Sequence, residues 1–257
     1  MSIQDTSKGS SETPKSAVFD TIKQPILWLA GLAFDIIWKD YQVSGLRFAI
    51  PHDLTDRAFR SRFLRDRYEG PERLYVSRYV KPGMRVMELG ACIGVVSAIT
   101  NKALDFSPSH VVVEANPRLI PWLSQNLKNN GCKTAVEHCL VSRSSDGTFY
   151  LHDLIVGGSN YRPTASRVTV PVLTVEELEA KHGVKFNVLI MDIEGGEHGF
   201  VMENKDWLRA IDLAIIEVHD AILSPEELGE LRHELEAAGL SFREKLDLTE
   251  VWQRSPQ

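Results

Sequence analysis

The feature that most constrains this chain is the stretch VMELGACIGVV at residues 86–96. Its first half is apolar and partly β-branched, which predicts a buried strand, and residues 95–103 continue with helical spacing of apolar residues. Gly90 and Gly94 bracket the turn between the two. A strand that ends in glycines and leads into a helix exposes backbone N–H groups and allows a ligand to approach closely. The stretch therefore predicts either a ligand-binding βα turn or a tight turn that binds nothing.

Strands and helices alternate from this stretch onward. Apolar runs predict strands over 84–88, 110–114, 134–141, 187–192 and 212–217, followed by two final strands over 240–246 and 249–253. Helices are predicted over 94–104, 117–130, 174–183, 198–209 and 224–239, with Asn116 as the N-cap of the second of these helices. This alternation predicts a doubly wound, mostly parallel α/β sheet whose last strand is antiparallel, because no helix separates the final two strands.

The chain before the first core strand differs in character. Residues 1–16 are polar and are expected to be a disordered tail. Residues 17–70 are expected to form an N-terminal extension of an apolar helix, short strands and an arginine-rich segment, and residues 71–257 one domain. The apolar run within 25–38 is shorter than the roughly 20 residues needed to span a bilayer. Residues 17–40 are therefore expected to pack on the core, to form a homodimer contact or to lie on a membrane surface.

The net charge and the number of cysteines limit which binding partners and which cellular compartment are expected. The net charge of −6 argues against nucleic-acid binding. Three cysteines without metal-ligand spacing are typical of reduced thiols, so the expected location is the cytoplasm, with or without membrane association. The one concentrated run of positive charge is either a solvated helix or a clamp for an anionic acceptor; it comprises Arg57, Arg60, Arg62, Arg65 and Arg67.

Acidic residues follow four of the five parallel strands, at the sheet edge where ligands of open α/β sheets bind. Glu114 ends the second strand, where a carboxylate can accept hydrogen bonds from both hydroxyls of a ribose. The chain lacks Gly-x-Gly-x-x-Gly and a phosphate-binding Gly-x-x-x-x-Gly-Lys loop, which argues against NAD and ATP. S-adenosylmethionine, a nucleoside without phosphates, fits instead, with S-adenosylhomocysteine as its product. The predicted cofactor-binding residues are Glu88, Gly90, Ala91, Gly94, Glu114, Ala115, Asn116 and Ser142.

Four stretches together resemble the FkbM family of class I S-adenosylmethionine-dependent methyltransferases. They are Tyr68-Glu69, residues 86–94, Val113-Glu114-Ala115-Asn116-Pro117 and Met191-Asp192-Ile193-Glu194-Gly195-Gly196-Glu197. The resemblance covers about residues 60–220 and implies a seven-stranded Rossmann-like fold with transfer of a methyl group to a hydroxyl of a sugar, glycan or small natural product. Two residues depart from the family pattern: Glu88 stands where Asp is common, and Cys92 where Asn is common.

The predicted catalytic residues are Asp192, Glu194 and His219, which follow the fourth and fifth parallel strands. A base near the acceptor hydroxyl would take its proton, and His219 is favoured because imidazole titrates near neutral pH. The same three side chains are also typical metal ligands, but acid–base chemistry without a metal is preferred. Glu197 is expected to support the site at a helix start. The alternative function is a methyltransferase-fold binding or scaffold protein without catalysis.

Overall fold

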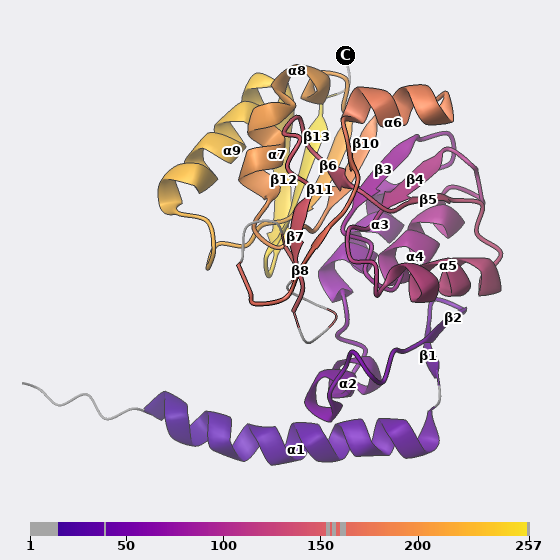
Figure 1. The fold of residues 1–257 in the computed structure, drawn as a ribbon, viewed down its shortest axis with the longest axis vertical. Helices are drawn as coiled ribbons and strands as arrows, with labels where there is room; N and C mark the ends of the chain where they lie inside the picture. Colours follow the sequence, from indigo (N-terminus) through magenta and orange to yellow (C-terminus); the bar gives the residue numbers. More distant parts are fainter. Residues whose placement is uncertain (1–14, 39, 153–154, 156–157, 160–162, 256–257) are drawn as a thin grey trace, which may run out of the picture.

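The computed structural model describes residues 15–38, 40–152, 155, 158–159 and 163–255, with side chains from residue 25 onward (Figure 1). Most of the predicted N-terminal tail lies outside these residues. The helices are α1 (Lys15–Ile37), α2 (Arg57–Leu64), α3 (Gly70–Tyr79), α4 (Val95–Ala103), α5 (Ile120–Asn129), α6 (Val175–His182), α7 (Glu197–Glu203), α8 (Lys205–Leu208) and α9 (Pro225–Ala237). The strands are β1 (Asp40–Val43), β2 (Leu46–Ala49), β3 (Val86–Leu89), β4 (His110–Val113), β5 (Ala135–Glu137), β6 (Leu140–Val141), β7 (Thr148–Tyr150), β8 (Arg167–Thr169), β9 (Val172–Leu173), β10 (Val188–Met191), β11 (Leu213–Glu217), β12 (Leu240–Leu246) and β13 (Thr249–Arg254).

The central sheet has seven strands in the order β12-β13-β11-β10-β3-β4-β5. The pairs β11–β10, β10–β3, β3–β4 and β4–β5 are parallel, whereas β13 runs antiparallel to both of its neighbours. The predicted doubly wound sheet and its antiparallel last strand are thus confirmed. Helices cover both faces of this sheet, and β7, β8 and the small β6–β9 pair lie beyond it (Figure 1).

Alternating residues of each central strand enter two separate cores. In β3, the side chain of Val86 packs in one apolar cluster with residues of α3, α4 and α5, and the side chain of Met87 in another with residues of α6, α7 and α9. The same division holds for Leu213 and Ala214 in β11. Because successive strand side chains point to opposite faces, a strand that is buried on both faces is expected to be mostly apolar, as β3 and β11 are apart from Glu88 and Glu217.

Most predicted helix ends are confirmed. Thr174 and Ser224 both form capping boxes, and Gly183 ends α6 in the left-handed conformation. The N-cap prediction for Asn116 is wrong: α5 begins at Ile120, and the Asn116 side chain instead accepts a hydrogen bond from the Arg118 amide in a preceding turn. The predicted helix 198–209 is divided into α7 and α8, and the predicted strand 134–141 into β5 and β6.

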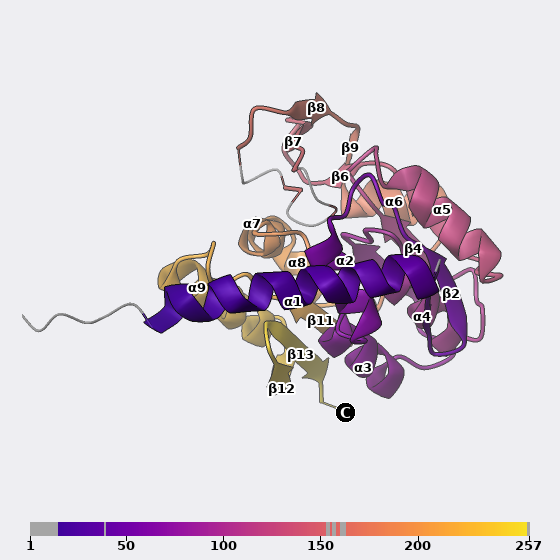
Figure 2. The ribbon, with the colours of Figure 1, turned by 90° about the horizontal axis from the view of Figure 1, so that it is seen from below.

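The N-terminal extension consists of two packed helices, α1 and α2, with a hairpin between them in the chain. Helix α1 lies along α2 beneath the sheet (Figures 1 and 2), and β1 pairs with β2 as an antiparallel hairpin. The contact between the helices is close at Gly31, where an added Cβ would lie 1.8 Å from the Arg57 carbonyl oxygen. An aromatic cluster of Phe34, Phe59, Phe63 and Tyr68 joins α1 and α2 to the segment before α3.

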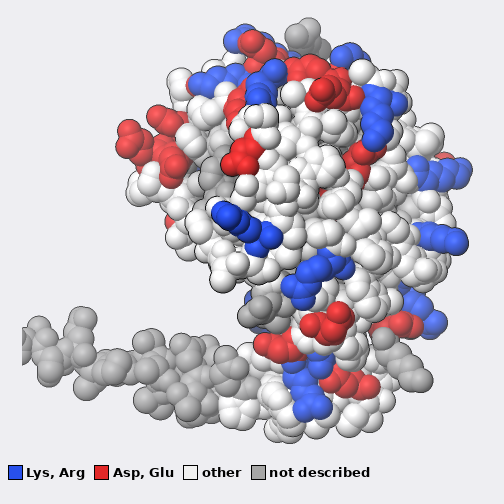
Figure 3. All heavy atoms as spheres, in the orientation of Figure 1, with Lys and Arg blue, Asp and Glu red and all other residues white. Residues whose placement is uncertain are grey.

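Arginines of the arginine-rich segment hold α2 against α1 within this extension. Arg60 is buried and forms a two-point ion pair with Asp35 of α1, and Arg57 contacts the ring of Trp28. Basic and acidic side chains lie next to one another where α2 is seen (Figure 3). The arginines do not line either cavity described below, so an anionic acceptor remains a prediction without support from this segment.

Helix α1 also carries an exposed apolar surface. Its exposed side chains are Ile26, Trp28, Leu29, Ile36 and Ile37, followed by Trp38. Among the residues that the structure describes, no helix is long and apolar enough to cross a membrane. A homodimer or membrane-surface contact through this helix remains a prediction.

Candidate active site

The order in which the chain adds strands to the sheet reverses between β3 and β10, which are parallel neighbours. From β3 the next strands are β4 and β5, and from β10 they are β11 and β13. Gly90 at the end of β3 has φ of +85°, and a Cβ there would lie 1.6 Å from the Asp192 carbonyl oxygen. Glycine is therefore required at this position by both backbone conformation and space. Open α/β sheets bind their ligands at such a reversal, outside the carboxyl ends of the strands.

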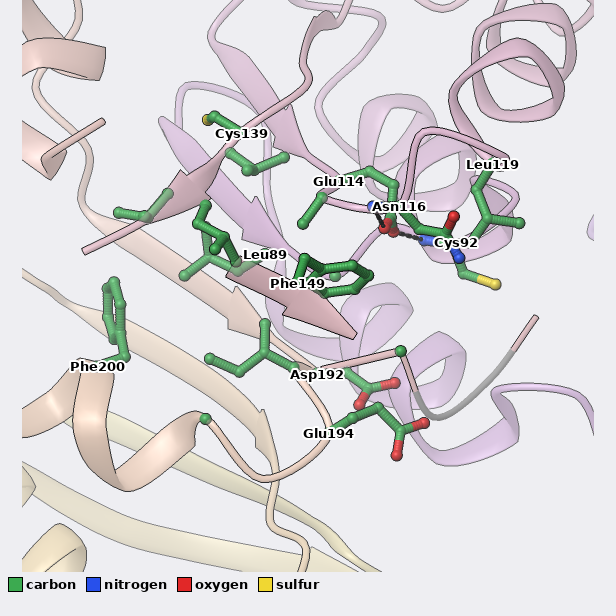
Figure 4. A pocket seen from close by; sticks show the side chains of 18 of the residues that line it. Leu89, Cys92, Glu114, Asn116, Leu119, Cys139, Phe149, Asp192, Glu194 and Phe200 are labelled. Atoms are coloured by element: carbon green, nitrogen blue, oxygen red, sulfur yellow. Dashed lines mark hydrogen bonds between the residues drawn. The ribbon is translucent and has the colours of Figure 1, made fainter. Parts of the chain in front are cut away.

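A cavity opens at this reversal point. Its empty volume is about 910 Å³ including the part open to solvent. Its walls combine apolar and acidic side chains, including Phe149, Phe200 and Leu119 (Figure 4). Seven of the predicted site residues line it: Gly90, Glu114, Ala115, Asn116, Ser142, Asp192 and Glu194. The topology thus brings together residues that are more than 100 positions apart in sequence.

Glu114 is fixed at one side of this cavity by the backbone. Its two carboxylate oxygens accept hydrogen bonds from the amides of Cys92, at 2.8 Å, and Asn116, at 2.7 Å (Figure 4). Burial raises the pKa of Glu114 to about 7, although these amides favour its ionised form. The carboxylate is therefore held in one orientation and retains lone pairs for further donors, as recognition of a ribose diol requires.

The glycine turn is tied to the N-terminal extension through Cys92. This residue has φ of +50°, a conformation that Asn adopts more readily than Cys, and its sulfur accepts a hydrogen bond from the Tyr68 hydroxyl. Burial raises the pKa of the Cys92 thiol well above its usual value, so the thiol stays protonated and serves packing. Gly94 does not line the cavity; its missing side chain makes room for Leu123 of α5, and its φ is +83°.

A smaller cavity of about 330 Å³ lies next to the first, and Glu69, Leu89, Gly90 and Asp192 line both. The predicted residues Glu88 and Ala91 line this smaller cavity. The carboxylate of Glu88 is buried, where it accepts a hydrogen bond from Ser97 and contacts the ring of His110. Those contacts give Glu88 a structural role, and its role in cofactor binding remains a prediction.

Glu69 is a site residue that was not selected from the sequence. It precedes α3 with φ of +48°, and its Oε2 atom is buried without a hydrogen-bond partner among the described residues. Burial and neighbouring carboxylates raise its pKa to about 8. A buried carboxyl group that lines both cavities and has one oxygen without a partner is suited to a cationic ligand group. The available signal was its place in the stretch Tyr68-Glu69, which carries the family resemblance.

His219 lies behind the cavity wall in a cluster of carboxylates. Its Nδ1 atom contacts Glu197 Oε1 at 2.9 Å, and its Nε2 atom lies 3.4 Å from Glu194 Oε2 and 3.7 Å from Asp192 Oδ1. His219 itself does not line either cavity. The predicted catalytic residues are therefore adjacent, with Asp192 and Glu194 facing the ligand space (Figure 4) and His219 behind them.

The electrostatics of this cluster follow from its excess of acids. Burial and the nearby Glu217 and Glu194 raise the pKa of Asp192 well above its usual value, and burial with Glu72 raises the pKa of Glu217 to about 7. The carboxylates raise the pKa of His219 against the effect of burial. At neutral pH this imidazole holds its proton more firmly than a free one, which weakens its case as a base.

Glu197 holds the loop that carries Asp192 and Glu194. Its fully buried carboxylate accepts hydrogen bonds from the amides of Ile193 and Gly195, as well as contacting His219. Glu194 and Gly195 both have positive φ values, so this turn needs such support. The expectation that Glu197 supports the site at a helix start agrees with these contacts.

The sheet order, with its one antiparallel strand, and the glycine turn beside an acidic second strand end define a Rossmann-like class I methyltransferase. The sequence model described as "Methyltransferase FkbM domain" matches residues 88–242, more than half of the chain. The chain therefore belongs to the FkbM methyltransferase family. A search of curated proteins found no match.

Solved structures with a similar arrangement are distant in sequence. A precorrin-6y C5,15-methyltransferase from Geobacter metallireducens is 12% identical, with a TM-score of 0.46, and the match covers 81% of this chain and 94% of that one. A methyltransferase from Pyrococcus furiosus is 10% identical, with a TM-score of 0.47 and coverage of 92% and 100%. An rRNA methylase from Streptococcus thermophilus is 10% identical, with a TM-score of 0.42 and coverage of 71% and 93%.

Proposed function

We propose that the larger cavity binds S-adenosylmethionine and that the protein transfers its methyl group to a hydroxyl oxygen of a sugar, glycan or small natural product. The observation that carries this proposal is the Glu114 carboxylate, which two backbone amides orient into a cavity at the strand-order reversal. Glu69 would meet the ammonium group of the methionine part, because its buried carboxylate oxygen lacks a partner. The apolar side chains of Leu119 and Phe149 offer walls for a base ring.

The carboxylates on the acceptor side would handle the proton. S-adenosylmethionine supplies an electrophilic methyl group when it is bound. The Asp192 and Glu194 carboxyl groups line the cavity, and Asp192, whose pKa burial raises well above its usual value, is a stronger base than an ordinary carboxylate. His219, held by Glu197, would orient these two groups and stabilise their negative charge. Positioning of the hydroxyl in line with the methyl group would contribute most of the rate.

The test is transfer of a labelled methyl group from S-adenosylmethionine to a panel of hydroxylated sugars and phenols, with amines and carboxylic acids of similar size beside them. We expect label in a base-stable ether, and in Asp192→Asn at least a tenfold loss of kcat with S-adenosylhomocysteine binding retained. Label in an amine or ester would overturn O-methylation. Cofactor binding without turnover on any acceptor would instead favour the non-catalytic scaffold.

A further inference from the structure

The group behind the acceptor side of the cavity has the composition of a metal site. A carboxylate oxygen of Asp192, a carboxylate oxygen of Glu197 and a ring nitrogen of His219 lie within 4.8 Å of one another. They come from three places in the fold: the end of β10, the first residue of α7 and the loop after β11. Two carboxylates and one imidazole form a ligand set that suits divalent first-row cations.

The distances within this group fit a shared ion. His219 Nε2 and Asp192 Oδ1 are 3.7 Å apart, too far for a hydrogen bond. Two ligand atoms that each lie about 2.1 Å from one cation, at an angle of about 120°, are separated by about this distance. The ring is also preoriented, because its Nδ1 atom faces Glu197 Oε1 at 2.9 Å and leaves Nε2 directed toward Asp192. Metal-ligating histidines are typically fixed by a carboxylate in this way.

Two buried oxygen atoms provide an independent indication that something is bound here. Asp192 Oδ1 and Glu197 Oε2 are inaccessible to solvent and have no hydrogen-bond partner among the described residues, and the Glu197 side chain is fully buried. A buried carboxylate oxygen without a donor is costly, and either a proton or a cation removes that cost. Among the ion pairs of the described residues, Asp192 and Glu197 have only His219 as a cationic partner.

We propose that Asp192 and the Nε2 atom of His219 bind a divalent cation of the Mn²⁺ type beside the acceptor end of the cavity, with Glu197 holding the imidazole in place through Nδ1. This deepens the proposed function and rests on it in one respect, that the acceptor hydroxyl lies next to Asp192. A cation at this position would attract that oxygen and fix its orientation. Glu194, which also lines the cavity, would remain the proton acceptor.

The test is a titration of the full-length, chelator-treated protein with MnCl₂, with free Mn²⁺ measured by electron paramagnetic resonance. We expect one Mn²⁺ bound per chain, and affinity lowered about 10–100-fold in both Asp192→Asn and Glu197→Gln. Each replacement keeps one acceptor oxygen, and cooperative thermal unfolding verifies that each variant is folded. The matched control is His198→Gln, because His198 of α7 contacts Glu230 and Glu227 of α9 without lining either cavity. Its affinity should stay within twofold of wild type.

Absence of stoichiometric Mn²⁺ binding by wild type at millimolar concentration would overturn the metal site, as would loss of binding in His198→Gln with retention in Asp192→Asn. A parallel titration with S-adenosylhomocysteine separates the two proposals. If the protein binds S-adenosylhomocysteine but does not bind Mn²⁺, the metal site is contradicted and the proposed function is not. If the protein binds Mn²⁺ but does not bind S-adenosylhomocysteine, the proposed function is contradicted and the cation site is retained.

Discussion

At the scale of single residues, the site is made of carboxyl groups that the fold holds away from water. Glu69 and Glu114 both line the larger cavity, and burial raises their pKa values to about 8 and about 7. They differ in their partners: Glu114 is held by two backbone amides, whereas one oxygen of Glu69 has no partner among the described residues. Under the proposed function, this difference suits Glu114 to neutral donors such as ribose hydroxyls and Glu69 to a cationic group.

Replacement of Glu69 by Gln should weaken S-adenosylhomocysteine binding about 10–100-fold, because a hydrogen bond to a charged group contributes about 1.5–3 kcal/mol. In wild type the affinity should rise as the pH increases from about 6 toward 8, since binding requires ionisation of a carboxyl group with a pKa of about 8. The Gln variant should lose this component of the pH dependence. Calorimetric titration at several pH values measures both effects.

Glu203→Gln is the matched control for this prediction. Glu203 also lines the larger cavity, but its carboxylate already accepts hydrogen bonds from Ser142 and Arg143. Its replacement should leave the affinity within about threefold of wild type. An equal loss in both variants would mean that Glu69 acts only through the general negative charge of the cavity.

The sequence predicts residues whose role is set by local pattern, and misses those whose role depends on packing. Gly90 and Glu114 could be selected because a strand end next to a glycine turn places them at the ligand edge. Glu69 could not, because its position beside Gly90 depends on how α3 packs under the sheet. The burial of His219 behind Asp192, and the rise of its pKa by Glu197, Glu194 and Glu217, also arise only on folding.

At the scale of elements, the N-terminal extension is attached through one close helix crossing. A Cβ at Gly31 would lie 1.8 Å from the Arg57 carbonyl oxygen, so Gly31→Ala should force α1 away from α2. We expect faster cleavage of the segment before α2 in limited proteolysis, with S-adenosylhomocysteine binding within about threefold of wild type because α1 does not line the cavity.

Gly229→Ala in α9 is the control for this change. Nothing lies within 4 Å of a Cβ at Gly229, so the substitution should stabilise the helix by about 0.5–1 kcal/mol and leave proteolysis of α1 unchanged. If Gly31→Ala were cleaved at the wild-type rate, α1 would not depend on this crossing.

Elements that are buried on both faces could be predicted well, and irregular ones could not. The β10 strand and the first four residues of β11 are continuous apolar runs, and β3 is apolar except for Glu88, as expected for strands with a core on both faces. The start of α5 was predicted too early, because the Asn116 amide donates to Glu114 and its side chain holds a turn, so the helix begins later. The run 134–141 divides because β5 joins the main sheet and β6 pairs with β9.

At the scale of the whole molecule, the raised acids make the stability of the ligand-free protein depend on pH. In the unfolded chain a Glu carboxyl titrates near 4.5, whereas in the folded protein Glu69 titrates near 8 and Glu114 and Glu217 near 7. Between these values the folded state binds more protons than the unfolded state, so stability falls as the pH rises. His219, whose pKa is also raised, acts in the same direction.

We therefore expect the Tm of the ligand-free protein to fall between about pH 5.5 and pH 8.5, and Glu69→Gln to reduce that fall. Differential scanning calorimetry in buffers of equal ionic strength measures the effect. The acids with lowered pKa, such as Glu137 and Glu244, influence stability mainly below this window. A Tm that rises steadily over the same range would contradict the raised pKa values in the cavity.

The central claim is that the cavity at the end of β3 is an S-adenosylmethionine site oriented by Glu114. Calorimetric titration of wild type and Glu114→Ala with S-adenosylhomocysteine tests it most directly. We predict stoichiometric, micromolar binding by wild type and at least a tenfold loss in the variant, with cooperative unfolding retained in both. No binding by wild type, or equal binding by the variant, would contradict the account.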